Sequence, residues 1–181
     1  MGRLRARTSV SARALEFTIL CATRVNEVAL AGGCEFDVAN ARWKIPGERM
    51  KGGKPHVVML SKRAVEIIRE LHPAGVKPDE LVFGVTGAAL TKMLVLAGYG
   101  DATVHGTARA SFKTWCDECT ACKDAISEAC LAHVEGDKVK AAYARGEFEQ
   151  QRAQLMEMWS QHCASPPVDT STNVVALRSA Q

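Results

Sequence analysis

The order of apolar and polar residues predicts a chain that is mostly helical. Apolar side chains recur at helical spacing over residues 11–31, where Ser11 is the expected N-cap and Gly32 follows the last turn. This stretch is either one helix or a pair of helices broken near Thr23. Further helices are expected over residues 62–71 with Ser61 as N-cap, over 86–98, from about Thr107 onward, and over 147–162.

Two short runs rich in β-branched and aromatic residues interrupt the helical pattern. They cover Trp43–Ile45 and His56–Leu60, and they flank a segment that contains Gly47, Gly52 and Gly53. Such runs around a glycine-rich link predict a hairpin or a small antiparallel sheet. The expected fold class is therefore α+β, mainly α with a small antiparallel β-sheet.

The length and hydropathy of the chain suit a single domain. A chain of 181 residues with 47% hydrophobic residues can bury one core. We expect a basic N-terminal segment at 1–10, one domain over 11–163 and a disordered tail over 164–181. No apolar run reaches the roughly 18 residues of a membrane span, and the basic N-terminus lacks the apolar stretch of a secretory signal. We therefore expect a soluble, cytoplasmic protein.

Seven cysteines include the run Cys116, Cys119 and Cys122, which could bind zinc with Cys130 or a histidine as fourth ligand. The run continues a helical pattern that begins near Phe112, and a spacing of three places the thiols along one stripe of a helix. Buried free thiols are the favoured interpretation, because free cysteine behaves as a small apolar residue. A zinc-binding interaction module stays open as an alternative.

Positive charge is concentrated near the N-terminus. Residues 1–63 contain 12 lysines and arginines against 5 acidic residues, although the net charge of the whole chain is only +3. A basic first third suits an anionic partner such as nucleic acid.

Two cations in this basic third are candidate site residues. Arg24 lies within an apolar helical segment, and a buried arginine must either pair with an acid such as Glu27 or face a ligand. Lys51 lies at the expected tip of the hairpin beside two glycines, which let a backbone approach a ligand closely. Taken alone, an ion pair and a solubilising lysine are the commoner explanations.

Two further pairs of residues complete the pattern. His105 and Arg109 are four apart, so they share a helix face if the helix starts early enough. His133 is followed ten residues later by Tyr143, one of only two tyrosines, which small and basic residues surround. A core tyrosine would lie among large apolar neighbours, so we expect Tyr143 to be accessible.

These six residues together describe a site for phosphoryl transfer on a phosphodiester. Such chemistry needs a nucleophile, cations for the non-bridging oxygens and an acid for the leaving alkoxide. Tyrosine is a covalent nucleophile, arginines bind phosphate oxygens bidentately, and a lysine on a hairpin can donate a proton. No cluster of carboxylates with metal-ligand spacing occurs, so side chains would supply the positive charge.

The sequence resembles the catalytic domain of the tyrosine recombinases, the phage-type integrases, and is most similar to their prophage and genomic-island subgroup. The resemblance rests on four segments in order, "ATRVNEV", "IPGERMKGGKPHVVMLS", "ATVHGTARASFKTW" and "LAHVEGDKVKAAYARG". It makes residues 11–163 the catalytic domain, with the tyrosine recombinase catalytic-domain fold. It implies site-specific DNA integration and excision in the bacterial cytoplasm. The implied partner is double-stranded DNA, bound at attachment sites by a homo-tetramer that is monomeric alone and needs no cofactor.

The resemblance also implies a role for each candidate residue. Arg24 and Arg109 would hold the scissile phosphate, and His105 and His133 would bond it and assist proton transfer. Lys51 would be the general acid that protonates the leaving 5′-oxygen. Tyr143 would attack the scissile phosphate to form a 3′-phosphotyrosyl bond, which the 5′-hydroxyl of a second strand later resolves.

Two features depart from the family pattern. His105 and Arg109 are separated by one residue more than usual, so either a turn absorbs the extra residue or Arg109 is displaced. Family members also carry a core-binding domain ahead of the catalytic domain, so we expect this chain to be a catalytic-domain fragment. The main alternative is a non-catalytic DNA-binding remnant of a decayed prophage integrase.

The last predicted helix allows two interpretations. Phe148, Leu155 and Trp159 form an apolar stripe along it. The stripe either packs on the chain's own core or, as the segment after the nucleophile often does in the family, docks on a neighbouring protomer.

Overall fold

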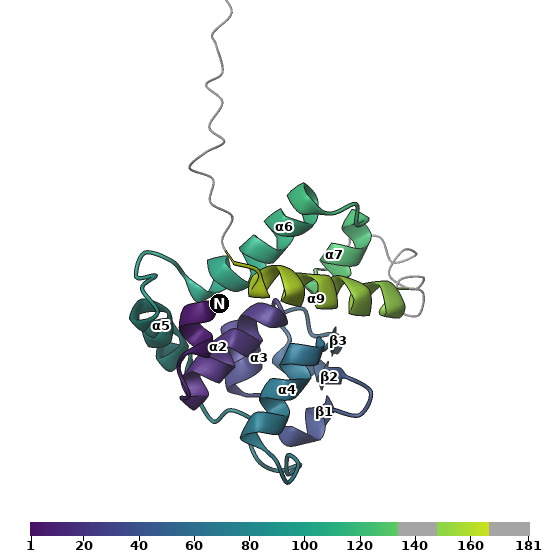
Figure 1. Cartoon of the computed structure of the whole chain (residues 1–181). Helices are drawn as coiled ribbons and strands as arrows, with labels where there is room; N and C mark the ends of the chain where they lie inside the picture. The colour runs from purple at the N-terminus through teal and green to yellow at the C-terminus, as the bar shows by residue number, and fades with distance from the viewer. Residues whose placement is uncertain (134–147, 167–181) are drawn as a thin grey trace, which may run out of the picture.

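The computed structural model of the chain describes residues 1–133 and 148–166, and Figure 1 shows how the elements are arranged. The helices are α1 Gly2–Arg5, α2 Val10–Leu20, α3 Val25–Ala29, α4 Lys62–Leu71, α5 Gly87–Leu96, α6 Ser111–Cys119, α7 Asp124–Cys130 and α9 Glu149–Ala164. Short turns of other helical types lie at Gly33–Glu35, Gly47–Arg49 and Gly106–Ala110. The strands are β1 Phe36–Asp37, β2 Arg42–Ile45 and β3 His56–Met59. The predicted α+β class is confirmed, and no helix in the described residues is long and apolar enough to cross a membrane.

The stretch expected as one helix or two is a pair of helices. α2 ends at Leu20 and α3 begins at Val25, so the break near Thr23 is confirmed. The N-cap of α2 is Ser9, whose side chain accepts a hydrogen bond from the backbone three residues on at 3.3 Å. The prediction of Ser11 as the cap was wrong, because the helix already includes the residue before it.

The sheet has three antiparallel strands in the order β1-β2-β3. β2 and β3 form the expected hairpin, in which Ile45 lies opposite His56 next to the connecting loop. β1 was not expected, because two residues are too few to show an alternating pattern. Trp43 of β2 is fully buried and stacks on Phe36 of β1, with ring centroids 5.2 Å apart.

α2 lies at the centre of the core. Its residues 14–20 are all buried, and a helix buried on all sides must be covered by other elements. The ring of Phe17 lies 5.6 Å from Trp43 of the sheet and 5.0 Å from Phe83, measured between centroids. The sheet is therefore attached to the helical core through aromatic packing on one residue of α2.

α9 packs on the chain's own core. Trp159 meets Phe112 edge-on, with centroids 5.6 Å apart, and lies 5.3 Å from Trp115 of α6. Its indole nitrogen donates to the carbonyl of Ile19 at 2.8 Å, and Leu155 is buried beside it on the same helix. Figure 1 draws α9 in yellow-green between α6 and α7 on one side and α2, α3 and α4 on the other. The apolar stripe thus belongs to the core of the same chain.

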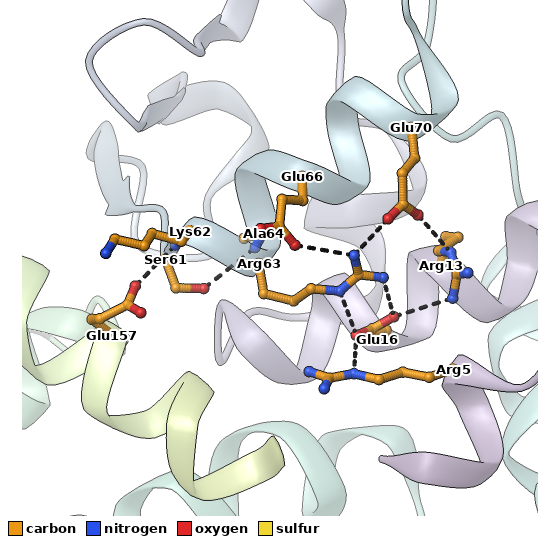
Figure 2. Close-up of polar contacts among 10 residues, drawn as sticks. All are labelled: Arg5, Arg13, Glu16, Ser61, Lys62, Arg63, Ala64, Glu66, Glu70 and Glu157. Carbon is orange, nitrogen blue, oxygen red and sulfur yellow. Dashed lines mark hydrogen bonds and ion pairs between the residues drawn. The ribbon is translucent and has the colours of Figure 1, made fainter.

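A network of ion pairs joins the N-terminal helix to α2 and α4 (Figure 2). Glu16 of α2 is fully buried and accepts from Arg5, Arg13 and Arg63 at 2.8–3.3 Å. Glu70 of α4 completes the network by pairing with Arg13 and Arg63. Burial raises the pKa of Glu16, but hydrogen bonds from Arg63 and Arg5 outweigh it and hold the pKa below its ordinary value. The network fixes the basic N-terminal segment against the domain.

The cysteines of the C-x2-C-x2-C run do not share one helix stripe. α6 ends at Cys119, so Cys122 lies in the loop that follows. Cys116 is buried, and burial raises its pKa to about 12, which disfavours the thiolate that zinc requires. In the part of the chain that the structure describes, no three histidine, cysteine or acidic residues are placed to hold a metal ion.

Candidate active site

Arg109 is a buried arginine whose guanidinium lies between two helix ends. Its Nη1 donates to the carbonyl of Ala22 at 3.0 Å, and its Nη2 donates to the carbonyl of Leu131 at 2.7 Å. Ala22 lies two residues after the end of α2, and Leu131 directly follows α7. Free carbonyls at helix C-termini carry partial negative charge, so two helix ends together stabilise this guanidinium.

Both of these helix ends place an alanine in the left-handed backbone region. Ala22 has a φ of 50° and Ala132 a φ of 52°. In each case the next residue's N–H bonds back to the carbonyl five residues earlier, at 3.3 Å after α2 and 3.1 Å after α7, which is a Schellman motif. Glycine is the usual residue at this position, because a Cβ destabilises the left-handed conformation by roughly 1–2 kcal/mol. Backbone strain of this kind is typical of functional sites, and here it lies on both sides of Arg109.

The turn that carries Arg109 is wider than an α-helical turn. The N–H of Ser111 donates to the carbonyl of Gly106, which is the i to i+5 bond of a π turn. A π turn holds one residue more than an α-helical turn and leaves the following helix intact. This geometry accommodates the four-residue spacing of His105 and Arg109.

Arg24 is the N-cap residue of α3 and is held by Glu27. Its Nη1 donates to one carboxylate oxygen of Glu27 at 2.8 Å, and its backbone N–H donates to the other at 2.8 Å. The ion pair considered from the sequence is therefore present. The side chain of Arg24 is nevertheless 28% exposed, against 4% for Glu27, so the guanidinium can still reach a ligand.

The two candidate arginines repel each other. Burial lowers the pKa of Arg109 to about 10, and the positive charge of Arg24 is the next largest cause. Glu27 and Glu128 act in the opposite direction and raise the pKa of Arg109. An anion bound by both guanidinium groups would relieve the repulsion, so the arrangement suits a phosphate.

His133 is fixed by one partner on each ring nitrogen. Its Nε2 lies 2.9 Å from Nη2 of Arg109, and its Nδ1 lies 2.5 Å from a carboxylate oxygen of Glu128. A guanidinium can only donate, so Nε2 accepts and Nδ1 carries the proton that is shared with Glu128. Arg109 and His133, which the family resemblance assigns to the same phosphate, are thus in direct contact.

Lys51 lies at the exposed tip of the loop between β2 and β3. Two residues before it, Arg49 donates to the carbonyl of Glu27 and pairs with the carboxylate of Glu35. Glu27 is also the partner of Arg24, so the loop is anchored to the helix that carries the first arginine.

The structure does not bring every candidate residue into contact. His105 is exposed at the start of the π turn. Tyr143 lies outside the described residues, together with the rest of the segment 134–147. Arg24, Arg109 and His133 form the part of the candidate site that the structure brings together.

His56 is a candidate site residue that sequence reasoning missed. It opens β3, and its Nε2 lies 3.2 Å from the carbonyl of Cys130. Burial is the main cause of a pKa of about 3, the charges of Arg152, Arg109 and Arg24 contribute in the same direction, and the bond to Cys130 acts in the opposite direction. The only signal in the sequence was its position after the glycine-rich loop, which marked it as a strand residue.

Half of the cations in residues 1–63 take part in internal ion pairs. They are Arg5, Arg13, Arg24, Arg42, Arg49 and Arg63. The N-terminal Arg3 and Arg7 instead donate to carbonyls at the end of α5. Lys44, Lys51 and Lys54 are exposed on the β2–β3 hairpin and its loop. The free positive charge of the basic third is therefore smaller than its composition suggested, and the hairpin carries much of it.

Several known integrases are similar to this chain. The prophage integrase IntA of Escherichia coli (strain K12) is 34% identical over 166 residues, which cover 86% of this chain and 39% of that protein. The prophage integrase IntZ of the same strain is 30% identical over 151 residues, covering 80% of this chain and 37% of that protein. The integrase of Shigella phage Sf6 is 28% identical over 160 residues, covering 83% and 40%.

The chain spans about two fifths of the length of these relatives. No protein-family profile matches it, and no solved structure does. The similarity to integrases from prophages and from phages covers most of the chain. The integrases of phages and prophages that it resembles are each similar to 80% or more of this chain.

Proposed function

We propose that the chain is the catalytic domain of a tyrosine recombinase and has the fold of that domain. It catalyses site-specific recombination of double-stranded DNA, as a monomer when free and as a homo-tetramer on DNA. Its integrase relatives support DNA recombination in general. The order of the four sequence segments and the contact between Arg109 and His133 support the specific chemistry.

The pair of arginines is the observation that carries the proposal. Within the described residues, Ala22, Leu131 and His133 engage three of the five N–H groups of Arg109, which leaves two for phosphate oxygens. With a pKa of about 10, Arg109 stays protonated at neutral pH. A phosphodiester held by Arg24 and Arg109 would remove the repulsion between them and receive charge-assisted hydrogen bonds from both.

In the proposed reaction, the phenolic oxygen of Tyr143 forms a bond to phosphorus while the bond from phosphorus to the 5′-oxygen breaks. The phenol gives its proton to one of the two site histidines, and Lys51 gives a proton to the leaving 5′-oxygen. His105 and His133 assist these transfers beside the phosphate. The 5′-hydroxyl of a second strand then attacks the phosphotyrosyl bond and releases Tyr143. The bond energy is kept in the covalent intermediate, so the cycle needs no ATP.

A covalent trap tests the proposal. The protein is incubated with a pool of duplexes of random sequence, each nicked near its centre so that the short cleaved fragment diffuses away. We expect a protein–DNA adduct that survives denaturing electrophoresis and that Tyr143→Phe abolishes. Sequencing of the trapped DNA then gives the cleavage site.

Two outcomes would overturn the proposal. An adduct that persists in Tyr143→Phe would assign the nucleophile to another residue. DNA binding by the wild-type chain without any adduct would favour a non-catalytic DNA-binding protein.

A further inference from the structure

The loop that carries Lys51 is anchored at two points. At the first, Arg49 donates to the carbonyl of Glu27 in α3. At the second, His56, which follows the loop directly, contacts the carbonyl of Cys130 through Nε2 at 3.2 Å. Lys51 lies between these two anchors along the chain.

The second anchor ends on the helix terminus that holds Arg109. Cys130 is the last residue of α7. The next residue, Leu131, gives its carbonyl to Nη2 of Arg109 at 2.7 Å. Two residues later, His133 contacts the same Nη2 at 2.9 Å. The hydrogen bond of His56 to Cys130 therefore joins the base of the loop to the part of the site formed by Arg109 and His133.

A neutral histidine is well suited to make this bond. Burial lowers the pKa of His56 to about 3, so the ring is uncharged at neutral pH. A carbonyl can only accept, so Nε2 carries the proton and donates it to Cys130. A neutral donor adds no positive charge beside Arg109 and Arg24, whereas a lysine or arginine at this position would.

We propose that His56 is a positioning residue for Lys51. Its bond to Cys130 sets the position of the loop relative to Arg109 and His133. The inference rests on the proposed function, in which Lys51 protonates the leaving 5′-oxygen. Loss of the bond displaces the general acid and leaves the two phosphate-binding arginines in place.

The test separates loss of the general acid from loss of phosphate binding. Nicked duplexes are prepared with an ordinary 5′-oxygen or with sulfur at the bridging 5′ position, because a thiolate leaves without being protonated. His56→Ala is expected to form adduct about 100-fold more slowly on ordinary DNA, since a misplacement of about 1 Å has roughly this effect. On the sulfur-containing DNA it should react at the wild-type rate, as should Lys51→Ala.

Two further variants control for structure. His56→Gln keeps a side-chain N–H that can reach the carbonyl of Cys130 and should restore most of the rate on ordinary DNA. His72→Ala removes a comparable bond, from Nε2 of His72 to the carbonyl of Val82 at 2.7 Å, far along the chain from the loop. This control variant should form adduct at the wild-type rate on both the ordinary and the sulfur-containing DNA. Equal losses on both substrates in His56→Ala would show that His56 serves phosphate binding or folding, and would overturn the inference.

Amide hydrogen exchange gives a readout that does not depend on activity. The N–H groups of Arg49, Met50 and Gly53 bond within the loop, and they should exchange faster in His56→Ala but not in His72→Ala. Unchanged exchange in His56→Ala would also overturn the inference. If the wild-type chain forms no adduct on either substrate, the proposed function fails and the exchange experiment alone decides whether His56 holds the loop.

Discussion

Nη1 of Arg109 donates to the carbonyl of Ala22 at 3.0 Å, across 87 residues of sequence. Ala22 lies two residues before Arg24, so the bond fixes the second candidate arginine relative to the first. The same guanidinium donates to the carbonyl of Leu131 at 2.7 Å. This bond also fixes the C-terminal end of α7, which leads to His133. Arg109 therefore has a structural role as well as the catalytic role that we propose.

Replacement of Arg109 tests both roles. If Arg109 served only to bind phosphate, Arg109→Ala would abolish cleavage with little loss of folding. Because two buried carbonyls would lose their donor, we now expect it also to lower the free energy of unfolding by about 2–4 kcal/mol. Arg109→Lys should keep the charge and lose less stability, but reduce the rate of adduct formation about 100-fold or more, because the planar fork is lost. Urea denaturation and the nicked-duplex assay measure the two effects separately.

The left-handed alanines predict a stabilising substitution. Ala132→Gly should raise the free energy of unfolding by about 1 kcal/mol, because glycine adopts the observed φ of 52° without a Cβ penalty. Ala41→Gly, at a φ of 52° in the turn between β1 and β2, is the matched control outside the site. Similar gains in the free energy of unfolding for the two variants, measured by urea denaturation, would show that the strain is local to the backbone. A loss of stability in Ala132→Gly would contradict the strain argument.

The exposed hairpin lysines should dominate the salt dependence of DNA binding. Each lysine that contacts a phosphate adds about 0.9 to the slope of log affinity against log salt concentration. Lys44→Gln and Lys54→Gln should each reduce the slope by about this amount, since both side chains are exposed. Arg13→Gln is the control, because Arg13 already pairs with Glu16 and Glu70. A larger change in slope for Arg13→Gln than for the lysines would place the DNA elsewhere.

The sequence predicted the parts of the fold that depend on neighbouring residues. Ser61 caps α4 as expected, with its side chain accepting from the backbone three residues on, because capping is decided within one turn. The short elements α1, α7 and β1 were missed, since four, seven and two residues give no clear periodicity.

The candidate site could be predicted from the sequence only in part, for a different physical reason. Arg109 and Arg24 could be assigned from residue type and order. The carbonyls that bind Arg109 come from two helix ends that are 87 and 22 residues away along the chain. Backbone acceptors leave no mark on residue identity, so no pattern predicted them. The contact of His56 with Cys130, 74 residues away, was hidden for the same reason.

The buried carboxylate of Glu16 predicts a loss of stability in acid. Its folded pKa lies below the ordinary value of 4.5, so its contribution is present above that pH and is lost as the pH falls through the folded pKa. Glu16→Gln should lower the free energy of unfolding by about 2–3 kcal/mol at pH 7, because Arg5 loses its carboxylate partner and the other two arginines each lose one of theirs. The difference from wild type should shrink below pH 4.5. Glu66→Gln, whose carboxylate is 58% exposed, should change stability by less than about 0.5 kcal/mol.

The position of Trp159 determines what removal of the last helix should do. The apolar stripe of α9 could have served a neighbouring protomer, in which case truncation after residue 145 would leave a folded domain. Trp159 instead is 4% exposed, packs on Phe112 and Trp115, and donates to the carbonyl of Ile19 at 2.8 Å. Trp159→Ala should therefore lower the free energy of unfolding by about 3–5 kcal/mol.

Two milder variants separate packing from the hydrogen bond at this position. Trp159→Phe keeps an aromatic ring against Phe112 but loses the bond to Ile19, so we expect a smaller loss, of about 1–2 kcal/mol. Met158→Ala is the control on the same helix, because Met158 is 49% exposed and should change stability by less than about 0.5 kcal/mol. Thermal denaturation followed by circular dichroism measures all three variants. Equal stabilities for wild type and Trp159→Ala would mean that α9 does not belong to the cooperative core, and docking on a partner would again be the better explanation of its apolar face.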